Sequence, residues 1–260
     1  MQSFQLFAPA DSFLYRMDPR VKVVAVGVVF LVSILFQDAR YLAPVFFVLL
    51  ALAVVGKVPL RRVALLLKSL TVLVTISMVM WPLLYRQGDT LFTVLGLPLT
   101  DEGIAHGIGM SFRILDMVLA PILLFLTTPQ SAFVAALRGL GLPYKPAFAL
   151  SLTFRFLPTV AGVGQTIVEA QRARGLDPSA GGVVARMKSY SRVLAPLVIT
   201  SLRIAQQTVL AVEARAFSIG RQRTMLRTLV FYRGDHVALL ALALATTTAV
   251  ALRAAGLGSL

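Results

Sequence analysis

The chain has 260 residues, of which 58% are hydrophobic and 14% charged, and its mean hydropathy is +0.83. A soluble domain of this length has about 45–50% apolar and about 25% charged residues, so this composition excludes an ordinary soluble domain and indicates an all-α polytopic membrane bundle. Cysteine is absent, which excludes disulfides, thiolate metal sites and cysteine nucleophiles.

The N-terminal part of the chain predicts two membrane spans. No small-residue cleavage site follows the first apolar run, so we expect no cleaved signal peptide. Asp18 stands at a natural N-cap position before Pro19, which predicts that a helix begins there. Residues 21–36 form the first expected span, which is short, and either tilt or snorkelling of Lys22 is expected to absorb the deficit. Residues 41–56 form the second span.

Three more spans follow from the same pattern. The basic loop at 57–62 is expected in the cytoplasm, because cytoplasmic loops carry an excess of Lys and Arg. The third expected span is 63–84, and the fourth, 103–126, follows an external loop that we interpret as a hairpin. The last apolar stretch, 236–252, is the fifth.

The segment 129–233 has a different character. It carries 14 Lys and Arg against three acids and so supplies +11 of the net charge of +14. Such a bias places a segment in the cytoplasm or against anionic lipid, an acidic protein or nucleic acid. No nucleic-acid-binding motif accompanies the charge, so nucleic acid is not an expected partner.

Three amphipathic helices are expected within this segment, at 131–140, 146–174 and 183–218, with a bend at Pro158 and an interruption at Pro196. The two long helices carry too many arginines for lipid-facing spans and too many apolar residues for free helices. They therefore fit helices that pack on the bundle and face the cytoplasm, although either could enter the bilayer and change the number of spans.

These patterns predict three parts. Residues 1–128 form an N-terminal bundle of four spans, 129–233 form a module on the cytoplasmic side, and 234–260 form a C-terminal transmembrane helix that packs on the bundle.

One charged pair is expected inside the membrane. Arg113 and Asp116 lie three residues apart in the fourth span, so they share a helix face and can form an ion pair. The pair is interpreted either as a structural contact turned to the bundle interior or as part of an ion or substrate relay.

No catalytic site can be assembled from the sequence. The chain has no Gly-x-x-x-x-Gly-Lys-Ser/Thr phosphate loop and no His-Glu-x-x-His motif, and its two histidines, His106 and His236, lie far apart. We therefore predict no catalytic residue, no metal site and no cofactor. Any ATP energy has to come from another protein.

The most unusual feature is a repeated arginine signature. Ala173-Arg174-Gly175 ends one long helical pattern and Ala214-Arg215-Ala216 ends the next, and Glu169 with Arg172 and Glu213 lie just upstream. A cation in the last turn and a glycine stop are favoured at any helix end. Two exposed arginine forks can also bind carboxylates or carbonyl groups of a partner protein.

An ordered set of motifs resembles a known family. The set comprises Asp18-Pro-Arg-x-Lys22, Arg113 through Thr127-Thr128-Pro129, Leu137-Arg-Gly-Leu-Gly-Leu-Pro143, Arg155-Phe-Leu-Pro158 and the two arginine signatures. It resembles the transmembrane T component of energy-coupling factor transporters, a branch of the ABC-type importers in the cell membrane of bacteria and archaea.

This resemblance implies an L-shaped protein with long coupling helices whose ends dock on two ABC-type ATPase subunits. The docking arginines would be Arg174 and Arg215, with Ala173, Gly175, Ala214 and Ala216 as small neighbours; Ala216 departs from the glycine of the family motif. A small membrane protein, the S component, would bind the substrate, a vitamin or a transition-metal ion, and the T component would couple ATP hydrolysis to substrate release.

Two alternatives come from other functional classes. A self-sufficient carrier driven by an ion gradient needs intramembrane acids or broken helices in paired repeats, and only Asp116 fits. A membrane-embedded enzyme acting on lipid needs clustered His, Asp and Glu residues, which are scarce in this sequence.

Overall fold

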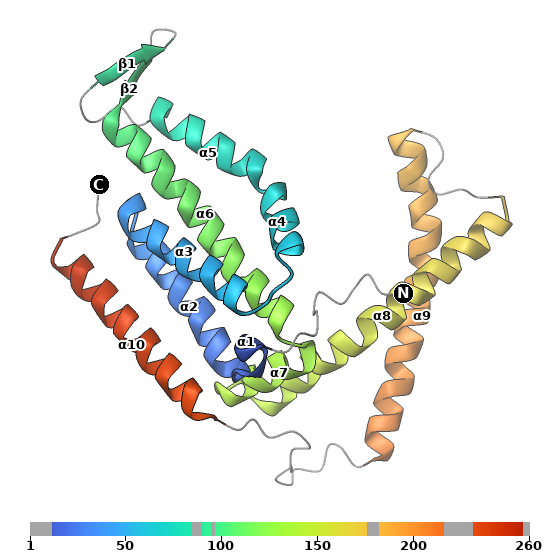
Figure 1. Ribbon diagram of the computed structural model, residues 1–260. Helices are drawn as coiled ribbons and strands as arrows, with labels where there is room; N and C mark the ends of the chain where they lie inside the picture. Colours follow the sequence, from blue (N-terminus) through green and yellow to red (C-terminus); the bar gives the residue numbers. More distant parts are fainter. Residues whose placement is uncertain (1–11, 85–89, 95–96, 176–181, 216–230, 257–260) are drawn as a thin grey trace. The chain divides into compact units, whose positions relative to one another are not determined.

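The computed structural model describes residues 12–84, 90–94, 97–175, 182–215 and 231–256 (Figure 1). The predicted all-α helical bundle is confirmed, with one small β-hairpin added to it. The elements in chain order are α1 (Phe13–Arg16), α2 (Pro19–Leu35), α3 (Ala39–Val55), α4 (Leu60–Ser69), α5 (Thr71–Leu84), β1 (Thr90–Val94), β2 (Leu97–Thr100), α6 (Asp101–Thr127), α7 (Gln130–Gly139), α8 (Tyr144–Ala173), α9 (Val183–Ala214) and α10 (Arg233–Ala254).

The chain divides into two compact units. The first comprises Met1–Tyr144 and Leu229–Leu260, and the second comprises Lys145–Thr228. The first unit therefore contains α1 to α7 together with α10, and the second contains α8 and α9.

Helix α6 is the central helix of the first unit. It packs against α2, α3 and α5 (Figure 1). The main apolar core forms along its second half, where Leu119 and Leu123 pack with Leu49 and Ala53 of α3 and with Val29 of α2. These side chains are close to fully buried, so α6 is held by apolar contacts with the helices on either side of it.

Glycines in the first half of α6 allow backbone to approach closely. A Cβ atom added at Gly109 would collide with the carbonyl group of Gln37 and would lie 3.2 Å from the Ala39 nitrogen. A Cβ at Gly107 would lie 3.1 Å from the Pro82 side chain of α5. The turn between α2 and α3 and the end of α5 can therefore lie directly against α6.

The third span, predicted over 63–84, is not one straight helix in the structure. The structure breaks it into α4 and α5, which meet at an angle of 47°. Ser69 Oγ donates to the Leu66 carbonyl over 2.6 Å, and such local bonds compete with the helical ladder. Because Arg61, Arg62 and Lys68 are exposed on α4, this half is amphipathic, whereas α5 is apolar.

The loop that follows α5 was interpreted as a hairpin, and β1 and β2 do pair antiparallel there. Helix α6 begins directly after β2. Its N-cap is Thr100, whose side chain accepts a hydrogen bond from the Gly103 nitrogen.

The number of spans depends on how α4 and α5 are counted. Four described helices are long and apolar enough to cross a membrane: Asp101–Thr127, Tyr144–Ala173, Ser189–Ala214 and Gly234–Ala254. The bent pair of α4 and α5 would make a fifth. Helices α2 and α3 have 17 residues each, which is about 25 Å of helix and somewhat less than the hydrocarbon thickness. Length and composition therefore allow α8 and α9 to span, and their cytoplasmic placement stays a prediction.

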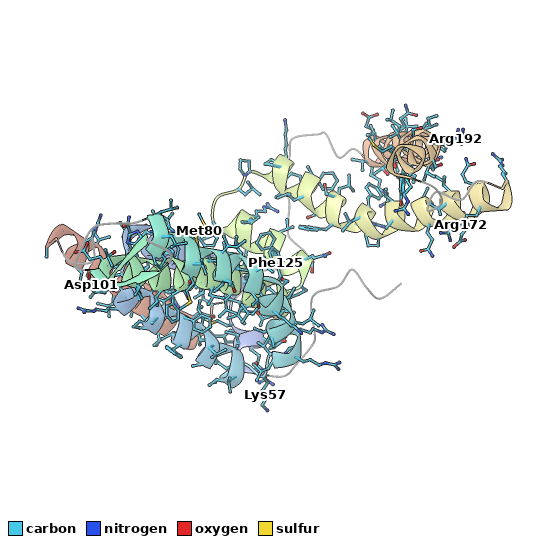
Figure 2. All side chains as sticks on the ribbon, turned by 90° about the horizontal axis from the view of Figure 1, so that it is seen from above. Lys57, Met80, Asp101, Phe125, Arg172 and Arg192 are labelled. Carbon is cyan, nitrogen blue, oxygen red and sulfur yellow. The ribbon has the colours of Figure 1, made fainter. Side chains whose placement is uncertain are left out.

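In the second unit, α8 and α9 cross each other. Gly164 of α8 faces Leu197 of α9, whose Cδ1 atom lies 3.7 Å from the position of a Cβ added at the glycine. Figure 2 looks along α9 and shows it end-on against α8, with Arg192 labelled on α9 and Arg172 on α8. Both helices run through their prolines without interruption, so the predicted break at Pro196 is wrong. Pro196 lacks a backbone N–H group, but the loss of this one hydrogen-bond donor does not end α9.

The close approach at Gly109 gives a test of the fold. Gly109→Ala should lower the apparent melting temperature in detergent by about 5 °C, because overpacking costs about 1–3 kcal/mol. The matched control is Gly27→Ala in α2, where an added Cβ meets nothing within 4 Å. The control should leave the melting temperature unchanged or raise it, because alanine favours helix over glycine. Equal melting temperatures for the two variants would contradict the packing.

Candidate functional site

The first arginine signature lies at the exposed end of α8. The helix ends at Ala173, and Gly175 adopts a left-handed conformation with φ = +81°. The Gly175 nitrogen donates to the Arg172 carbonyl over 2.9 Å, and the Arg174 nitrogen donates to the Gln171 carbonyl over 3.1 Å. A residue with a Cβ is strained in this conformation, so Gly175 is the residue that lets the chain turn away directly after Arg174.

The second signature lies at the end of α9. The helix ends at Ala214, and Arg215 is its C-cap residue. Ala216, the third residue of this signature, lies outside the described residues. Both Ala214 and Arg215 are exposed. Ala173, Gly175 and Ala214, the small neighbours that the resemblance implies for the two arginines, are all exposed at these helix ends.

Arg174 and Arg215 lie at the ends of two different helices. Each is exposed, and neither side chain has a partner within the part of the chain that the structure describes. The two glutamates upstream, Glu169 and Glu213, are also exposed and form no ion pair among the described residues. Because α8 and α9 cross, their C-terminal ends point away from the crossing in different directions (Figure 1). The two arginines therefore lie at helix ends that point in different directions.

The predicted pair of Arg113 and Asp116 is not formed in the structure. The Arg113 guanidinium turns to the C-terminal end of α2, where its Nη2 atom donates to the carbonyl groups of Ile34 (3.1 Å) and Phe36 (3.0 Å) and its Nε atom to that of Ser33. The last carbonyl groups of a helix lack intrahelical partners. Arg113 supplies those partners, and this explains why it does not turn to Asp116.

Asp116 is left as a buried carboxylate without a hydrogen-bond partner. It has no exposed surface, and both of its oxygen atoms are unpaired among the described residues. An unpaired polar group is costly in an apolar bundle. An ion or substrate relay would need a second polar group beside Asp116. Arg113 does not provide it, because its guanidinium binds the carbonyl groups at the end of α2.

A buried polar cluster at one end of the first unit was not predicted from the sequence. It consists of Asp18, Lys22, Thr127, Thr128 and Asp235, and each has at most 7% of its surface exposed. Lys22 does not snorkel, which corrects that prediction. Its Nζ atom donates to the Thr127 carbonyl (3.2 Å) and to the Thr128 hydroxyl (3.3 Å).

Asp235 completes this cluster from the start of α10. One of its carboxylate oxygens accepts from the Asp18 nitrogen over 3.0 Å and the other from the Tyr232 nitrogen over 2.9 Å. Asp18 also acts as the N-cap of α2, as predicted, and accepts from the Arg20 nitrogen over 2.8 Å. The motif residues Asp18, Lys22, Thr127 and Thr128 carried a signal in the sequence. Asp235 carried none, because its partner lies 217 residues away.

The described residues contain no group of three or more His, Cys, Asp or Glu side chains that could hold a metal ion. His106 is buried in α6, and its ring lies 4.8 Å from that of Trp81. The geometry thus offers exposed arginines and a buried polar cluster.

Comparison with known proteins identifies the family. The family model described as "Cobalt transport protein" (CbiQ) matches residues 10–226. The energy-coupling factor transporter transmembrane protein EcfT of Limosilactobacillus fermentum (strain CECT 5716 / Lc40) is 32% identical over 247 residues, which cover 91% of this chain and 91% of the relative. The EcfT proteins of Bacillus subtilis (strain 168) and Listeria innocua serovar 6a are 29% and 30% identical, over 88% and 91% of this chain and 89% and 92% of their own lengths.

The chain belongs to the EcfT family of transporter transmembrane proteins. The resemblance to the T component of energy-coupling factor transporters is therefore confirmed. Within this family the relatives are named as transmembrane proteins of a transporter, and the four long apolar helices of this chain agree with a membrane protein.

Because Arg113 and Asp116 do not contact each other, substitutions at the two residues should change stability in different ways. Arg113→Met should lower the apparent melting temperature in detergent, because it leaves the carbonyl groups at the end of α2 without donors. Asp116→Asn should leave the melting temperature unchanged or raise it, because it removes an unpaired buried carboxylate.

The matched control for the arginine substitution is Arg40→Met, at an exposed position near the start of α3, which should have little effect. A loss of stability in Asp116→Asn equal to that in Arg113→Met would show that the two side chains act as a pair.

Proposed function

We propose that this protein is the scaffold and energy-transducing subunit of an energy-coupling factor importer. In this proposal two partner ATPases hydrolyse ATP, and the chain couples that hydrolysis to substrate release from a membrane S component. The chain itself is not an enzyme, and residues 129–233 lie on the cytoplasmic side of the cell membrane. The observation that carries the proposal is the pair of exposed arginines at the ends of two crossed helices in a family of transporter membrane proteins.

The form of the two helix ends supports docking on proteins. An arginine fork makes paired hydrogen bonds to carboxylates or carbonyl groups, and small neighbouring residues permit the close approach of a partner. Arg174 lies between Ala173 and Gly175, and Arg215 follows Ala214. The crossing of α8 and α9 at Gly164 separates the two ends, which suits one ATPase at each arginine.

The charge of the second unit supports its placement in the cytoplasm. Arg155, Arg186, Arg192 and Arg203 are exposed along α8 and α9 in addition to the two docking arginines. An excess of positive charge beside membrane spans marks the cytoplasmic face. ATP is available on that face, and the sequence has no phosphate loop of its own, so the energy would enter through the partner subunits.

The apolar surface of α9 supports a further membrane partner. Met187, Tyr190, Leu194, Val198 and Leu202 recur three or four residues apart, and all are more than half exposed. Residues at this spacing form one stripe along a helix. A stripe of this size needs an apolar cover, and in this proposal the S component supplies it.

The docking role is tested by charge reversal. The double variant Arg174→Glu/Arg215→Glu should bind the two ATPases at least about 100-fold more weakly, because it turns two interface cations into anions. Affinity purification of the membrane complex measures the ATPases that remain bound. The chain should still insert in the membrane, since both side chains are exposed at helix ends.

The matched control is Arg155→Glu/Arg203→Glu, which reverses two exposed arginines away from the ends of the same helices. This control should retain the ATPases. A double reversal at Arg174 and Arg215 that assembles and transports normally would refute the docking assignment.

A further inference from the structure

Helix α7 belongs to the first unit and directly precedes α8 of the second unit in the chain. It has ten residues and is joined to α6 by Thr128 and Pro129 and to α8 by residues 140–143. Its main packing partner is α2, and Val134 and Ala136 are buried. A motion that passes along the chain from the start of α8 to the bundle therefore passes through this helix, and the other connection of the second unit leads to α10.

The start of α7 is held by Lys22. The ammonium group reaches from α2 to the chain between α6 and α7, where it donates to the Thr127 carbonyl over 3.2 Å and to the Thr128 hydroxyl over 3.3 Å. Lys22 is 7% exposed and Thr128 is 3% exposed. A buried charge–dipole contact of this kind is stronger than the same contact in water, so the α6–α7 turn is fixed to the first turn of α2.

The end of α7 is held by Arg20, two residues before Lys22. The guanidinium group lies against Gly139, the last residue of α7, and a Cβ added there would lie 2.8 Å from the Arg20 Cζ atom. The same group lies over the ring of Phe231, 5.1 Å from its centre, at a distance that gives a cation–π contact. The Arg20 guanidinium can occupy this position because residue 139 is a glycine and has no Cβ atom.

Gly139 differs in this respect from Gly141, two residues later. Gly141 has φ = +110°, and nothing would lie within 4 Å of an added Cβ. It ends α7 in a Schellman-type turn, with the Leu142 nitrogen bonded to the Leu137 carbonyl over 3.0 Å. The glycine at 141 is therefore needed for the turn, and the glycine at 139 for the Arg20 contact.

Two carboxylates bind the backbone beside these cations. The Asp18 side chain accepts a hydrogen bond from the Arg20 backbone nitrogen, and the Asp18 backbone nitrogen donates to Asp235 at the start of α10. The segment that carries Arg20 and Lys22 therefore connects α7 to the starts of α2 and α10. Movement at the start of α7 has to exchange the buried polar contacts of Lys22, and movement at its end has to displace the Arg20 guanidinium.

From these contacts we propose that Arg20 and Lys22, the basic clamp, hold α7 at both ends and transmit movement of the coupling helices to α2 and α10. This proposal rests on the proposed function. With the clamp intact, displacement of α8 by the ATPases turns α7 together with the starts of α2 and α10. With one end released, the same displacement is absorbed in the chain at 128–129 or 140–143, and ATP is hydrolysed without release of substrate.

Two substitutions release one end each and leave the buried cations in place. Thr128→Val is isosteric and removes one acceptor of Lys22, while the Thr127 carbonyl remains. Gly139→Ala displaces the flexible end of Arg20 and gains helix propensity. Their matched controls are Thr247→Val, whose hydroxyl bonds only to carbonyl groups of its own helix, and Gly27→Ala, which has open space around it.

The experiment uses the complete importer, with the ATPases and the S component, reconstituted in vesicles. Three quantities are measured: ATPases retained on purification, ATP hydrolysed, and substrate imported per ATP. Thr128→Val and Gly139→Ala should retain the ATPases and hydrolyse ATP, but import about three- to tenfold less substrate per ATP, the range expected for a change in coupling between sites. Both controls should match the unmodified chain.

The outcomes separate the clamp from the proposed function. An unmodified chain that retains no ATPase refutes the proposed function. An unmodified chain that transports normally, with substrate imported per ATP within about twofold of it in both clamp variants, refutes the clamp. Equal losses of ATP hydrolysis and import would also overturn it, because they indicate a merely structural role for these contacts.

Discussion

The buried ammonium group of Lys22 is the interaction on which the arrangement of the first unit depends. A charge removed from water at the start of α2 is stable only with oxygen partners, and these come from Thr127 and Thr128 at the end of α6. Asp18 and Asp235 supply the negative charge nearby, and their own contact ties α2 to α10. Leaving a buried donor without its acceptor costs about 1–3 kcal/mol, so this cluster helps to fix which helix ends meet.

Unsatisfied helix ends explain where the other buried and exposed cations lie. Arg113 donates to the last carbonyl groups of α2 instead of pairing with its neighbour Asp116. Arg20 lies against the last residue of α7. Arg174 and Arg215 also lie at helix ends, but no part of the described chain covers them. Cations are favoured at the C-terminal ends of helices. Inside the bundle these cations join one helix to another, and at the ends of α8 and α9, within the described chain, their hydrogen-bond donors are free for a partner protein.

The two units differ in how their apolar surface is covered. In the first, α6 is surrounded by α2, α3 and α5, and its second half forms a core with them. In the second, α8 and α9 meet at a crossing near Gly164, and most apolar side chains of α9 stay exposed. A pair of crossed helices with so little shared surface has few contacts of its own to hold it. Its exposed apolar faces need a cover beyond this helix pair, which lipid or another protein surface can supply.

The sequence by itself determined the class of protein, most helix positions, the N-cap at Asp18 and the arginine signatures at two helix ends. These are local properties, because hydropathy, caps and stops are read within a few residues. Tertiary structure decided the rest. The partners of Arg113 and the burial of Lys22 depend on groups from other helices, and Asp235 lies 217 residues from the backbone group it binds. Spacing along one helix permits a contact, but competition among all buried donors and acceptors selects the contact that forms.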